Sequence, residues 1–180
     1  LAIYSIAELC GLKQEEILVG LSKLKAANGR FETYRLKNGA TAIIDYAHTP
    51  DALLNVISTI NEIKLEGKLI TVVGCGGNRD KTKRPEMAKI AQEGSNIVIL
   101  TSDNPRFENP EDIIEDMKKG VVDNENLFFI TDRRQAIKLA SQLAKDKSDI
   151  ILVAGKGHET YQEIEGVKHH FDDKEEILKY

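Results

Sequence analysis

Two charged segments of the sequence are suited to binding a small molecule that carries both a carboxylate and an ammonium group. The first is the tetrapeptide Asp103-Asn104-Pro105-Arg106, and the second is the pentapeptide Gly155-Lys156-Gly157-His158-Glu159. The guanidinium of Arg106 can donate two hydrogen bonds to one carboxylate, and Pro105 stiffens the backbone ahead of it. Glu159 supplies the opposite charge for an ammonium group. Taken alone, the tetrapeptide is more typical of a solvated turn, so the prediction depends on the neighbouring loops.

A glycine-rich loop over residues 74–81 adds a second arginine. Arg79 is a further candidate for binding a carboxylate, and two arginines with one glutamate suit a diamino dicarboxylate better than a simple amino acid. The loop does not match the dinucleotide-binding fingerprint, because its third glycine position holds Arg79. We expect Cys75 to be a small residue near the end of a strand. We expect the remaining cations of the loop to be solvated charges beside the site: Lys81, Lys83 and Arg84.

A predicted strand-to-helix junction over residues 45–50 is a candidate nucleotide site. Asp45, at the end of the strand, can accept hydrogen bonds from both hydroxyls of a ribose. Thr49 can instead be a plain N-cap ahead of Pro50, and a lone histidine such as His48 is more often structural. Since no spacing of His, Cys and Glu matches a metal-site template, we predict no metal site.

The elements that must position these segments alternate between strand and helix. Apolar runs predict strands over residues 31–36, 41–45, 69–73, 97–100, 127–130 and 149–153. Helical spacing predicts helices over residues 17–24, 50–63, 85–93, 110–119, 134–145 and 173–178. Asn38-Gly39 is a strong hairpin signal, and a second hairpin is expected around Glu165-Gly166.

This alternation predicts an α/β fold that is Rossmann-like, with a mostly parallel sheet and helices on both faces. The hairpin over residues 31–45 and a helical stretch precede it. Three loops leave the carboxyl ends of the strands, over residues 74–84, 101–110 and 154–160. Because such sheets bind ligands at that edge, we expect the charged segments to meet there.

Composition narrows the classes of function. The net charge is −4, and no block of lysine and arginine is long enough to track a nucleic-acid backbone. No apolar run approaches the roughly 20 residues that span a bilayer. Cys10 and Cys75 match no metal or redox spacing, so we expect a cytoplasmic protein whose partners are neither nucleic acid nor membrane. The chain begins at Leu1 rather than Met, and we expect it to be part of a longer protein.

Several segments, taken in order, resemble the carboxyl-terminal domain of the Mur ligases. The segments that carry the resemblance are Gly29-Arg30-Phe31-Glu32, Asp45-Tyr46-Ala47-His48-Thr49-Pro50-Asp51-Ala52-Leu53, Gly74-Cys75-Gly76-Gly77, Arg79-Asp80-Lys81, Lys83-Arg84-Pro85, Asp103-Asn104-Pro105-Arg106 and Gly155-Lys156-Gly157-His158-Glu159. Each segment is weak alone, whereas the ordered set is highly specific. In that family, Asp-Asn-Pro-Arg is the motif of the enzymes that add meso-diaminopimelate to the stem peptide of peptidoglycan, and enzymes that add lysine differ there.

The resemblance implies which residues bind which ligand. Those expected to bind meso-diaminopimelate are Arg79, Asp103, Asn104, Pro105, Arg106, Gly155 and Glu159. Those expected on the nucleotide side are Arg30, Asp45, Tyr46 and His48. The implied reaction uses ATP and Mg²⁺: the carboxylate of UDP-N-acetylmuramoyl-L-alanyl-D-glutamate is phosphorylated, and the amine of the amino acid then attacks to form an amide.

The resemblance also implies domain boundaries in the chain and implies which functional elements each domain carries. Residues 1–28 would be the last helical stretch of the family's central domain, and residues 29–180 the amino-acid-binding carboxyl-terminal domain. The phosphate loop, the Mg²⁺ ligands and most of the UDP site belong to the other two domains in this family. We therefore expect no catalytic residue in this sequence, partner domains from the same protein, and an isolated chain that is inactive.

Three small departures from the family pattern leave the identity of the substrate amino acid undecided. Asn78, Thr82 and Ser102 stand where many members carry Asp, Gly and Asp, so a related diamino acid such as lanthionine stays an alternative. Two further alternatives are a nucleotide-binding oxidoreductase domain, weakened by the broken glycine fingerprint, and an interaction module without enzymatic activity.

Overall fold

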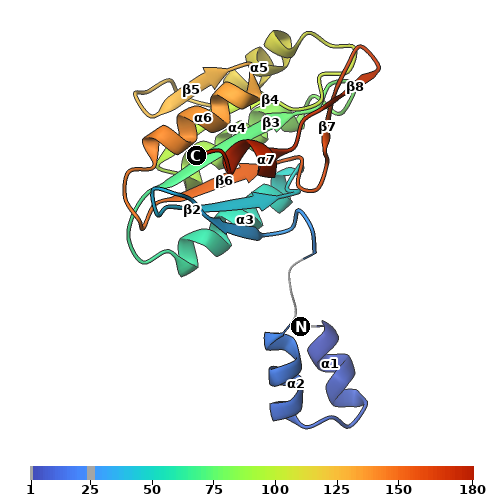
Figure 1. Ribbon diagram of the computed structural model, residues 1–180. Helices are drawn as coiled ribbons and strands as arrows, with labels where there is room; N and C mark the ends of the chain where they lie inside the picture. Colours follow the sequence, from blue (N-terminus) through green and yellow to red (C-terminus); the bar gives the residue numbers. More distant parts are fainter. Residues whose placement is uncertain (1, 24–26) are drawn as a thin grey trace.

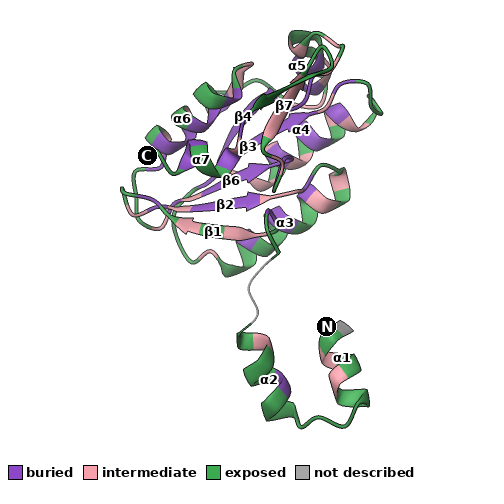
Figure 2. Ribbon diagram, turned by 45° about the vertical axis from the view of Figure 1, so that its right-hand side comes forward, coloured by how far each residue is buried: buried purple, intermediate pink, exposed green. Residues whose placement is uncertain are grey.

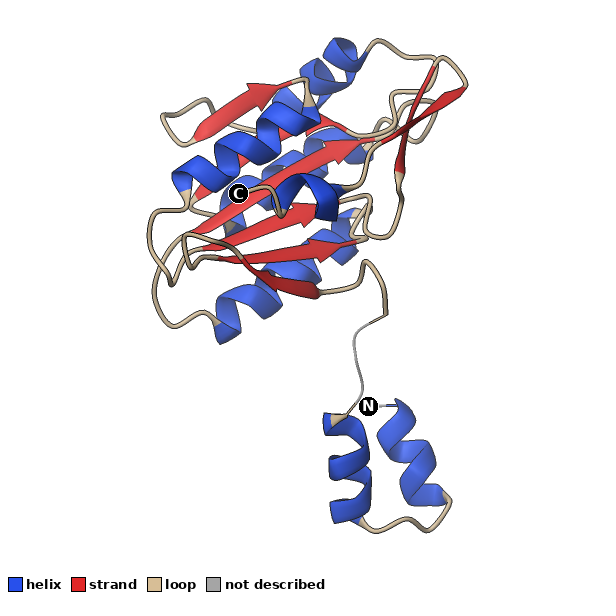
Figure 3. Ribbon diagram, viewed as in Figure 1, coloured by secondary structure: helices blue, strands red, loops and turns tan. Residues whose placement is uncertain are grey.

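The computed structural model describes residues 2–23 and 27–180, and the main body is a six-stranded sheet covered by helices (Figures 1 and 3). The strand order is β1-β2-β6-β3-β4-β5. Only β1 runs antiparallel to its neighbour, and every other neighbouring pair in this sheet is parallel. The strands are β1 (Glu32–Arg35), β2 (Thr41–Asp45), β3 (Leu69–Cys75), β4 (Ile97–Ser102), β5 (Leu127–Ile130) and β6 (Ile150–Ala154). The predicted fold class is confirmed.

Helices lie on both faces of the sheet, and each face has its own apolar core. The first face is covered by α3 (Pro50–Ile63), α4 (Lys83–Gly94) and α5 (Pro110–Lys118), and the second by α6 (Arg133–Leu143) and α7 (Asp173–Ile177). All seven residues of β3 are buried, which explains its unbroken apolar run (Figure 2). The predicted helix and strand types are therefore correct throughout the sheet domain.

Helix α3 shows how the sequence sets its local structure. The Thr49 side chain accepts a hydrogen bond from the Ala52 amide, and Pro50 occupies the first turn. Leu53 and Ile60 point into the core. Ile63, at the last position of the helix, is 58% exposed.

Two strands extend further than the sequence predicted. The pairing of β3 with β4 continues through Gly74↔Thr101 and Cys75↔Ser102. Gly74 permits this because a Cβ there would lie 2.5 Å from the Thr101 carbonyl oxygen. The two loops therefore begin at residues 76 and 103, which brings their charged segments to the very end of the sheet.

A small second sheet carries the segment after the pentapeptide. Strands β7 (Tyr161–Ile164) and β8 (Val167–His170) form the predicted hairpin, with positive φ at Glu165 and Gly166. The backbone of Arg106 forms a parallel bridge with Ile164. The hairpin thus lies against the tetrapeptide (Figure 1).

Two short helices precede the sheet domain, α1 (Ala2–Leu9) and α2 (Gln14–Ser22), and they contact each other. The sequence predicted α2. It did not predict α1, because this helix has only eight residues and its apolar pattern covers few turns. Within α2, Ile17 is buried whereas Leu18 is 51% exposed, and Leu24 lies outside the described residues. The proposed division at residue 28 stays a prediction. No helix in the described part of the chain is long and apolar enough to cross a membrane.

Candidate functional site

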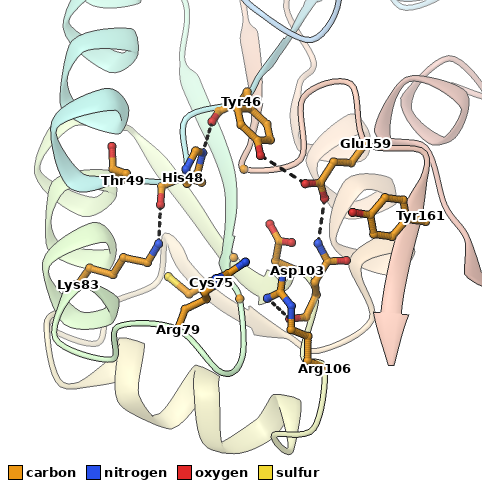
Figure 4. A pocket seen from close by; sticks show the side chains of 14 residues that line it. Tyr46, His48, Thr49, Cys75, Arg79, Lys83, Asp103, Arg106, Glu159 and Tyr161 are labelled. Carbon is orange, nitrogen blue, oxygen red and sulfur yellow. Dashed lines mark hydrogen bonds between the residues drawn. The ribbon is translucent and has the colours of Figure 1, made fainter. Parts of the chain in front are cut away.

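A cavity of about 420 Å³ opens where β2, β3, β4 and β6 end (Figure 4). Eight of the predicted binding residues line it: Tyr46, His48, Arg79, Asp103, Asn104, Arg106, Gly155 and Glu159. Pro105 instead lines a neighbouring cavity beneath the β7–β8 hairpin. Arg30 and Asp45 lie beside Tyr46 rather than in the wall. The structure thus brings the charged segments together at the edge of the sheet that the topology predicts.

Arg106 is held more tightly than the sequence indicated. Its backbone has φ of +53°, and it is fixed to the hairpin by hydrogen bonds from its amide to the Glu163 carbonyl and from the Glu165 amide to its own carbonyl. Its Nε lies 3.3 Å from a carboxylate oxygen of Glu163, and Nη1 donates to the Gly77 carbonyl at 2.9 Å. The charge of Arg106 is therefore partly matched by an internal carboxylate. The expectation that its guanidinium is fully available to a ligand carboxylate is corrected.

The acidic side of the cavity is a connected network rather than a single glutamate. Asn104 donates through Nδ2 to Glu159 at 2.8 Å, and its Oδ1 accepts from Lys156 at 3.2 Å. Lys156 Nζ lies 3.4 Å from Glu159 Oε2 and 3.9 Å from Asp103 Oδ1. Gly155 permits the close approach, since a Cβ there would lie 2.7 Å from Asp103.

Sequence reasoning missed three residues of this site. From the sequence, Lys156 was named only as part of the pentapeptide and was given no role, although a lysine between two glycines after a buried strand is an unusual placement. Tyr161 and Lys83 also line the cavity, and Lys83 donates to the His48 carbonyl at 2.8 Å. Tyr161 follows the pentapeptide by only two residues, so its position was within reach of the sequence.

Arg84 corrects another expectation. It was expected to be solvated, but it is fully buried, with ion pairs to Glu108 at 3.0 Å and Asp116 at 2.9 Å. The first turn of α4 directs it toward Asp116 on α5 and toward Glu108 in the loop that precedes α5. Lys81 is exposed as expected, although it also pairs with Glu108.

Glu108 and Gly77 connect the two charged loops. Glu108 accepts from Arg84, from the Asn78 amide and from Lys81, and the hydrogen bonds from Arg84 are the main reason that its pKa falls to about 2. The Gly77 amide donates to the Asn104 carbonyl, and a Cβ on Gly77 would lie 1.9 Å from the Pro105 carbonyl oxygen. This glycine thus serves a close approach between loops.

The other end of the cavity is aromatic. The ring of Tyr46 lies 4.5 Å from that of His48 and 5.2 Å from that of His158, and the Arg30 guanidinium lies 5.8 Å from the Tyr46 ring. Burial, followed by the charge of Glu159, raises the pKa of Tyr46, so its hydroxyl stays a neutral donor. Asp45 already accepts from the Phe31 amide at 2.8 Å, so only part of its carboxylate is free for a ribose.

The cavity wall includes Cys75, whose thiol is not ionised. Cys75 is buried, and burial raises the pKa of its thiol to about 12, so it is not a thiolate at neutral pH. His169 and His170 are exposed on β8. Within residues 2–23 and 27–180, no group of three or more His, Cys, Asp or Glu side chains gathers in a way that could hold a metal ion.

The parallel sheet and the zwitterionic cavity at its edge define a ligand-binding α/β domain, and comparison with known families places it. Residues 29–157 match the family model described as Mur ligase, glutamate ligase domain. Because this match covers well over half of the chain, the chain belongs to the Mur ligase family.

Individual relatives narrow the comparison. The chain is 61% identical to the UDP-N-acetylmuramoyl-L-alanyl-D-glutamate–2,6-diaminopimelate ligase of Parabacteroides distasonis, over 98% of this chain and 37% of the relative. Identity to the Bacteroides fragilis ligase of the same name is 58%, over 99% and 37%. A solved structure of a ligase with this name matches with a TM-score of 0.79 and 45% identity, over 98% and 36%. The chain spans just over a third of the length of these relatives.

More distant structures share the fold alone. A folylpolyglutamate synthase from Mycobacterium tuberculosis, solved with ADP and AMPPCP, matches with a TM-score of 0.60 at 19% identity, over 84% of this chain and 35% of that one. A folylpolyglutamate synthase/dihydrofolate synthase from Yersinia pestis, solved with AMPPNP and a manganese ion, matches with a TM-score of 0.61 at 23% identity, over 82% and 32%. The fold of the sheet domain is therefore shared with proteins named as synthases.

Proposed function

We propose that this chain is the amino-acid-binding part of an ATP-dependent, amide-forming ligase that adds meso-diaminopimelate to UDP-N-acetylmuramoyl-L-alanyl-D-glutamate in peptidoglycan synthesis. The observation that carries the proposal is the cavity in which Arg79 and Arg106 stand opposite Asp103 and Glu159. The names of the 58–61% identical relatives support the same assignment. A free amino acid needs both of its charges matched, and this cavity supplies both kinds of partner.

In this proposal the two arginines bind carboxylates of the incoming amino acid. Arg79 lies in the cavity wall, and Arg106 is oriented by Glu163 and Gly77. Asp103 and Glu159 bind an ammonium group, with Asn104 and the backbone at Gly155 completing the pocket. Pro105 contributes by shaping the loop rather than by contact, since it lines the neighbouring cavity.

These residues hold the nucleophile and exclude misplaced amines. The amine that forms the amide has to face the activated carboxylate, and holding it there replaces a bimolecular encounter with an oriented one. A ligand that lacks the distal carboxylate or ammonium leaves a charged side chain of the site unmatched. Selection and orientation of the amino acid are thus the contribution of this part of the ligase.

The aromatic end fits a nucleotide. Arg30 would approach the phosphates of ATP, Asp45 a ribose hydroxyl, and Tyr46 with His48 would line the base or sugar. ATP, when bound, supplies the phosphoryl group that activates the carboxylate, and Mg²⁺ accompanies it. The family resemblance assigns the phosphate loop, the Mg²⁺ ligands and the UDP site to other domains, so we expect the isolated chain to form no amide. A cytoplasmic location belongs to the same proposal.

The test compares amino acids that differ by one charged group. In an NMR titration of the ¹⁵N-labelled chain, we expect meso-diaminopimelate to shift the resonances of residues 79, 103–106 and 155–159 and to saturate. Lysine lacks one carboxylate, so we expect its affinity to be at least about tenfold lower. Lysine binding as tightly at the same residues would overturn the assignment.

The same titration separates the alternatives. Lanthionine carries the same two carboxylates and two ammonium groups, so tighter binding of lanthionine would assign it as the amino acid. NADH binding with shifts in the glycine-rich loop over residues 74–81 would instead indicate an oxidoreductase. Because the chain belongs to the Mur ligase family, we expect no such shifts.

A further inference from the structure

Lys156 lies behind the cavity wall, and its side chain is completely buried, which is unusual for a lysine. Its ammonium group lies 3.2 Å from Asn104 Oδ1, 3.4 Å from Glu159 Oε2 and 3.9 Å from Asp103 Oδ1. The ring of Tyr161 lies 5.5 Å from the same nitrogen. A buried charge is costly unless partners match it, and here two carboxylates, an amide oxygen and an aromatic ring lie near the ammonium group.

The backbone of the pentapeptide turns this lysine inward. Gly155 has φ of +116° and Gly157 has φ of +53°, both in the region that favours glycine. A Cβ on Gly157 would lie 2.6 Å from the Gly29 carbonyl and 2.7 Å from Tyr46. The two glycines therefore let the loop pack tightly while the stem of Lys156 enters the interior.

The charges of the local cluster of Asp103, Glu159 and Lys156 do not balance. Asp103 and Glu159 carry two negative charges, and Lys156 carries one positive charge. Behind them, the buried Arg133 is already matched by Asp173, with two contacts of 2.7 Å. The cluster facing the cavity is therefore left with one unmatched negative charge, which corresponds to one ligand ammonium group.

We propose that Lys156 is a positioning residue that fixes Asn104 and Glu159 in the cavity wall and leaves the cluster one positive charge short. This inference rests on the proposed function, because the ligand ammonium is that of the incoming amino acid. Lys156 itself does not touch the ligand. Its ammonium holds both partners of the hydrogen bond between Asn104 and Glu159, so both side chains reach the cavity already oriented.

The test compares two ligands and four variants of the chain by NMR titration. The ligands are meso-diaminopimelate and 2-aminopimelate, which keeps both carboxylates but lacks one ammonium group. The variants are Lys156→Met, Glu159→Gln, the double variant, and Lys37→Met as a control. Lys37 is exposed and donates to the carbonyl of Lys179, so its removal deletes one lysine charge outside the cavity.

The proposal makes three quantitative expectations. Wild type and Lys37→Met prefer meso-diaminopimelate over 2-aminopimelate by at least about tenfold, as expected for a hydrogen-bonded charge. Lys156→Met abolishes most of that preference while the affinity for 2-aminopimelate changes less. The double variant discriminates no less than the worse single variant, because both changes disable the same contact.

A second readout does not depend on any ligand. In wild type, the side-chain amide of Asn104 donates to Glu159, so its proton resonance is shifted and exchanges slowly. Lys156→Met removes that shift, whereas Glu159→Gln reduces it, because the amide oxygen of glutamine still accepts but carries no charge. If Lys156→Met does not fold, Lys156→Gln carries the same comparisons, since it removes the charge and keeps a donor.

The outcomes separate the two proposals. Retained preference in a folded Lys156→Met, or an unchanged Asn104 signal, overturns the role of Lys156. Effects of the two substitutions that add fully also overturn it, because they indicate independent contributions. Equal binding of both ligands by wild type contradicts the proposed function instead, and the Asn104 signal then still decides whether Lys156 orients these side chains.

Discussion

Four arginines near the edge of the sheet form two contrasting pairs. Arg84 and Arg133 are fully buried, and each is closed off by carboxylates of the same domain. Arg106 is partly exposed at the cavity and shares its charge with Glu163. Arg79 lines the cavity and takes part in none of the ion pairs among the described residues.

The difference between the pairs separates arginines that hold the fold from arginines that are available to a ligand. A buried guanidinium has to be matched inside the protein, because desolvation of an unmatched charge costs several kcal/mol. A guanidinium at a cavity can leave part of its donor set to a ligand. Burial of the guanidinium together with matching carboxylates of the domain, rather than residue type, therefore distinguishes the two roles.

The largest effect on stability is expected from breaking the buried ion pair between Arg133 and Asp173. Arg133 donates to Asp173 twice and also to the carbonyls of Ser102 and Ala154, which directly precede Asp103 and Gly155. Arg133→Met leaves Asp173 buried without a partner, and we expect a loss of about 3–5 kcal/mol in the free energy of unfolding.

Urea denaturation of the chain measures this loss. The matched control is Arg134→Met, since Arg134 is about half exposed and its partner Glu176, although buried, keeps its ion pair with Lys179. We expect the control to lose about 0–1 kcal/mol. Similar losses of unfolding free energy in the two variants would show that the buried ion pair of Arg133 contributes no more to stability than the ion pair of the half-exposed Arg134.

The sequence predicted the sheet and the meeting of its loops, because those follow from local patterns. The apolar run of β3 and the Asn38-Gly39 turn are visible in a few neighbouring residues. The partners of Arg84 were not predictable in this way, since Glu108 and Asp116 lie 24 and 32 positions along the chain. An ion pair that depends on how α4 packs against α5 leaves no signal in the spacing of charges.

The site shows the same limit. The motifs identified Arg106 and Glu159, but not that Glu163 and Lys156 would already engage them. Glu163 reaches Arg106 only because β7 forms a bridge with the tetrapeptide. Which charges are free therefore depends on tertiary contacts, whereas which charges are present at the edge could be predicted from the sequence.

Substitution of Arg79 or Arg106, the two arginines at the cavity, is expected to affect ligand binding rather than stability. We expect Arg79→Ala and Arg106→Ala each to weaken meso-diaminopimelate by about tenfold to a hundredfold, as for a lost hydrogen bond to a charged group. Binding of ATP is expected to change far less, since both arginines lie at the amino-acid end. NMR titrations with each ligand measure this, and equal losses for both ligands would argue against the assignment.

A smaller effect on stability is expected from Glu108, the node between the charged loops. Its pKa is lowered from an ordinary 4.5 to about 2, mainly by hydrogen bonds from Arg84. A lowered pKa means that the contribution is fully present above about pH 4.5 and is lost as the pH falls toward 2.

Glu108→Gln therefore removes about 1–2 kcal/mol of the free energy of unfolding at pH 7, a value reduced to allow for solvent screening. The difference between wild type and variant is expected to shrink between pH 4.5 and pH 2, as measured by urea denaturation at each pH. A difference that stays constant across this range would show that the charge of Glu108 is not responsible.

The smallest effect is expected at Glu163, and it tests how far Arg106 is open. Because Glu163 shares the charge of Arg106, Glu163→Gln returns that charge to the cavity while its amide oxygen still accepts from Nε. We expect meso-diaminopimelate to bind about two- to threefold more tightly, a modest gain for a partly exposed pair. The double variant Arg106→Ala with Glu163→Gln is expected to lose the gain, because no guanidinium remains to be released. Weaker binding by Glu163→Gln would mean that the Glu163 carboxylate mainly orients Arg106 and does not compete with the ligand for its charge. Arg106 would then resemble the buried Arg84 and Arg133 more than it resembles Arg79.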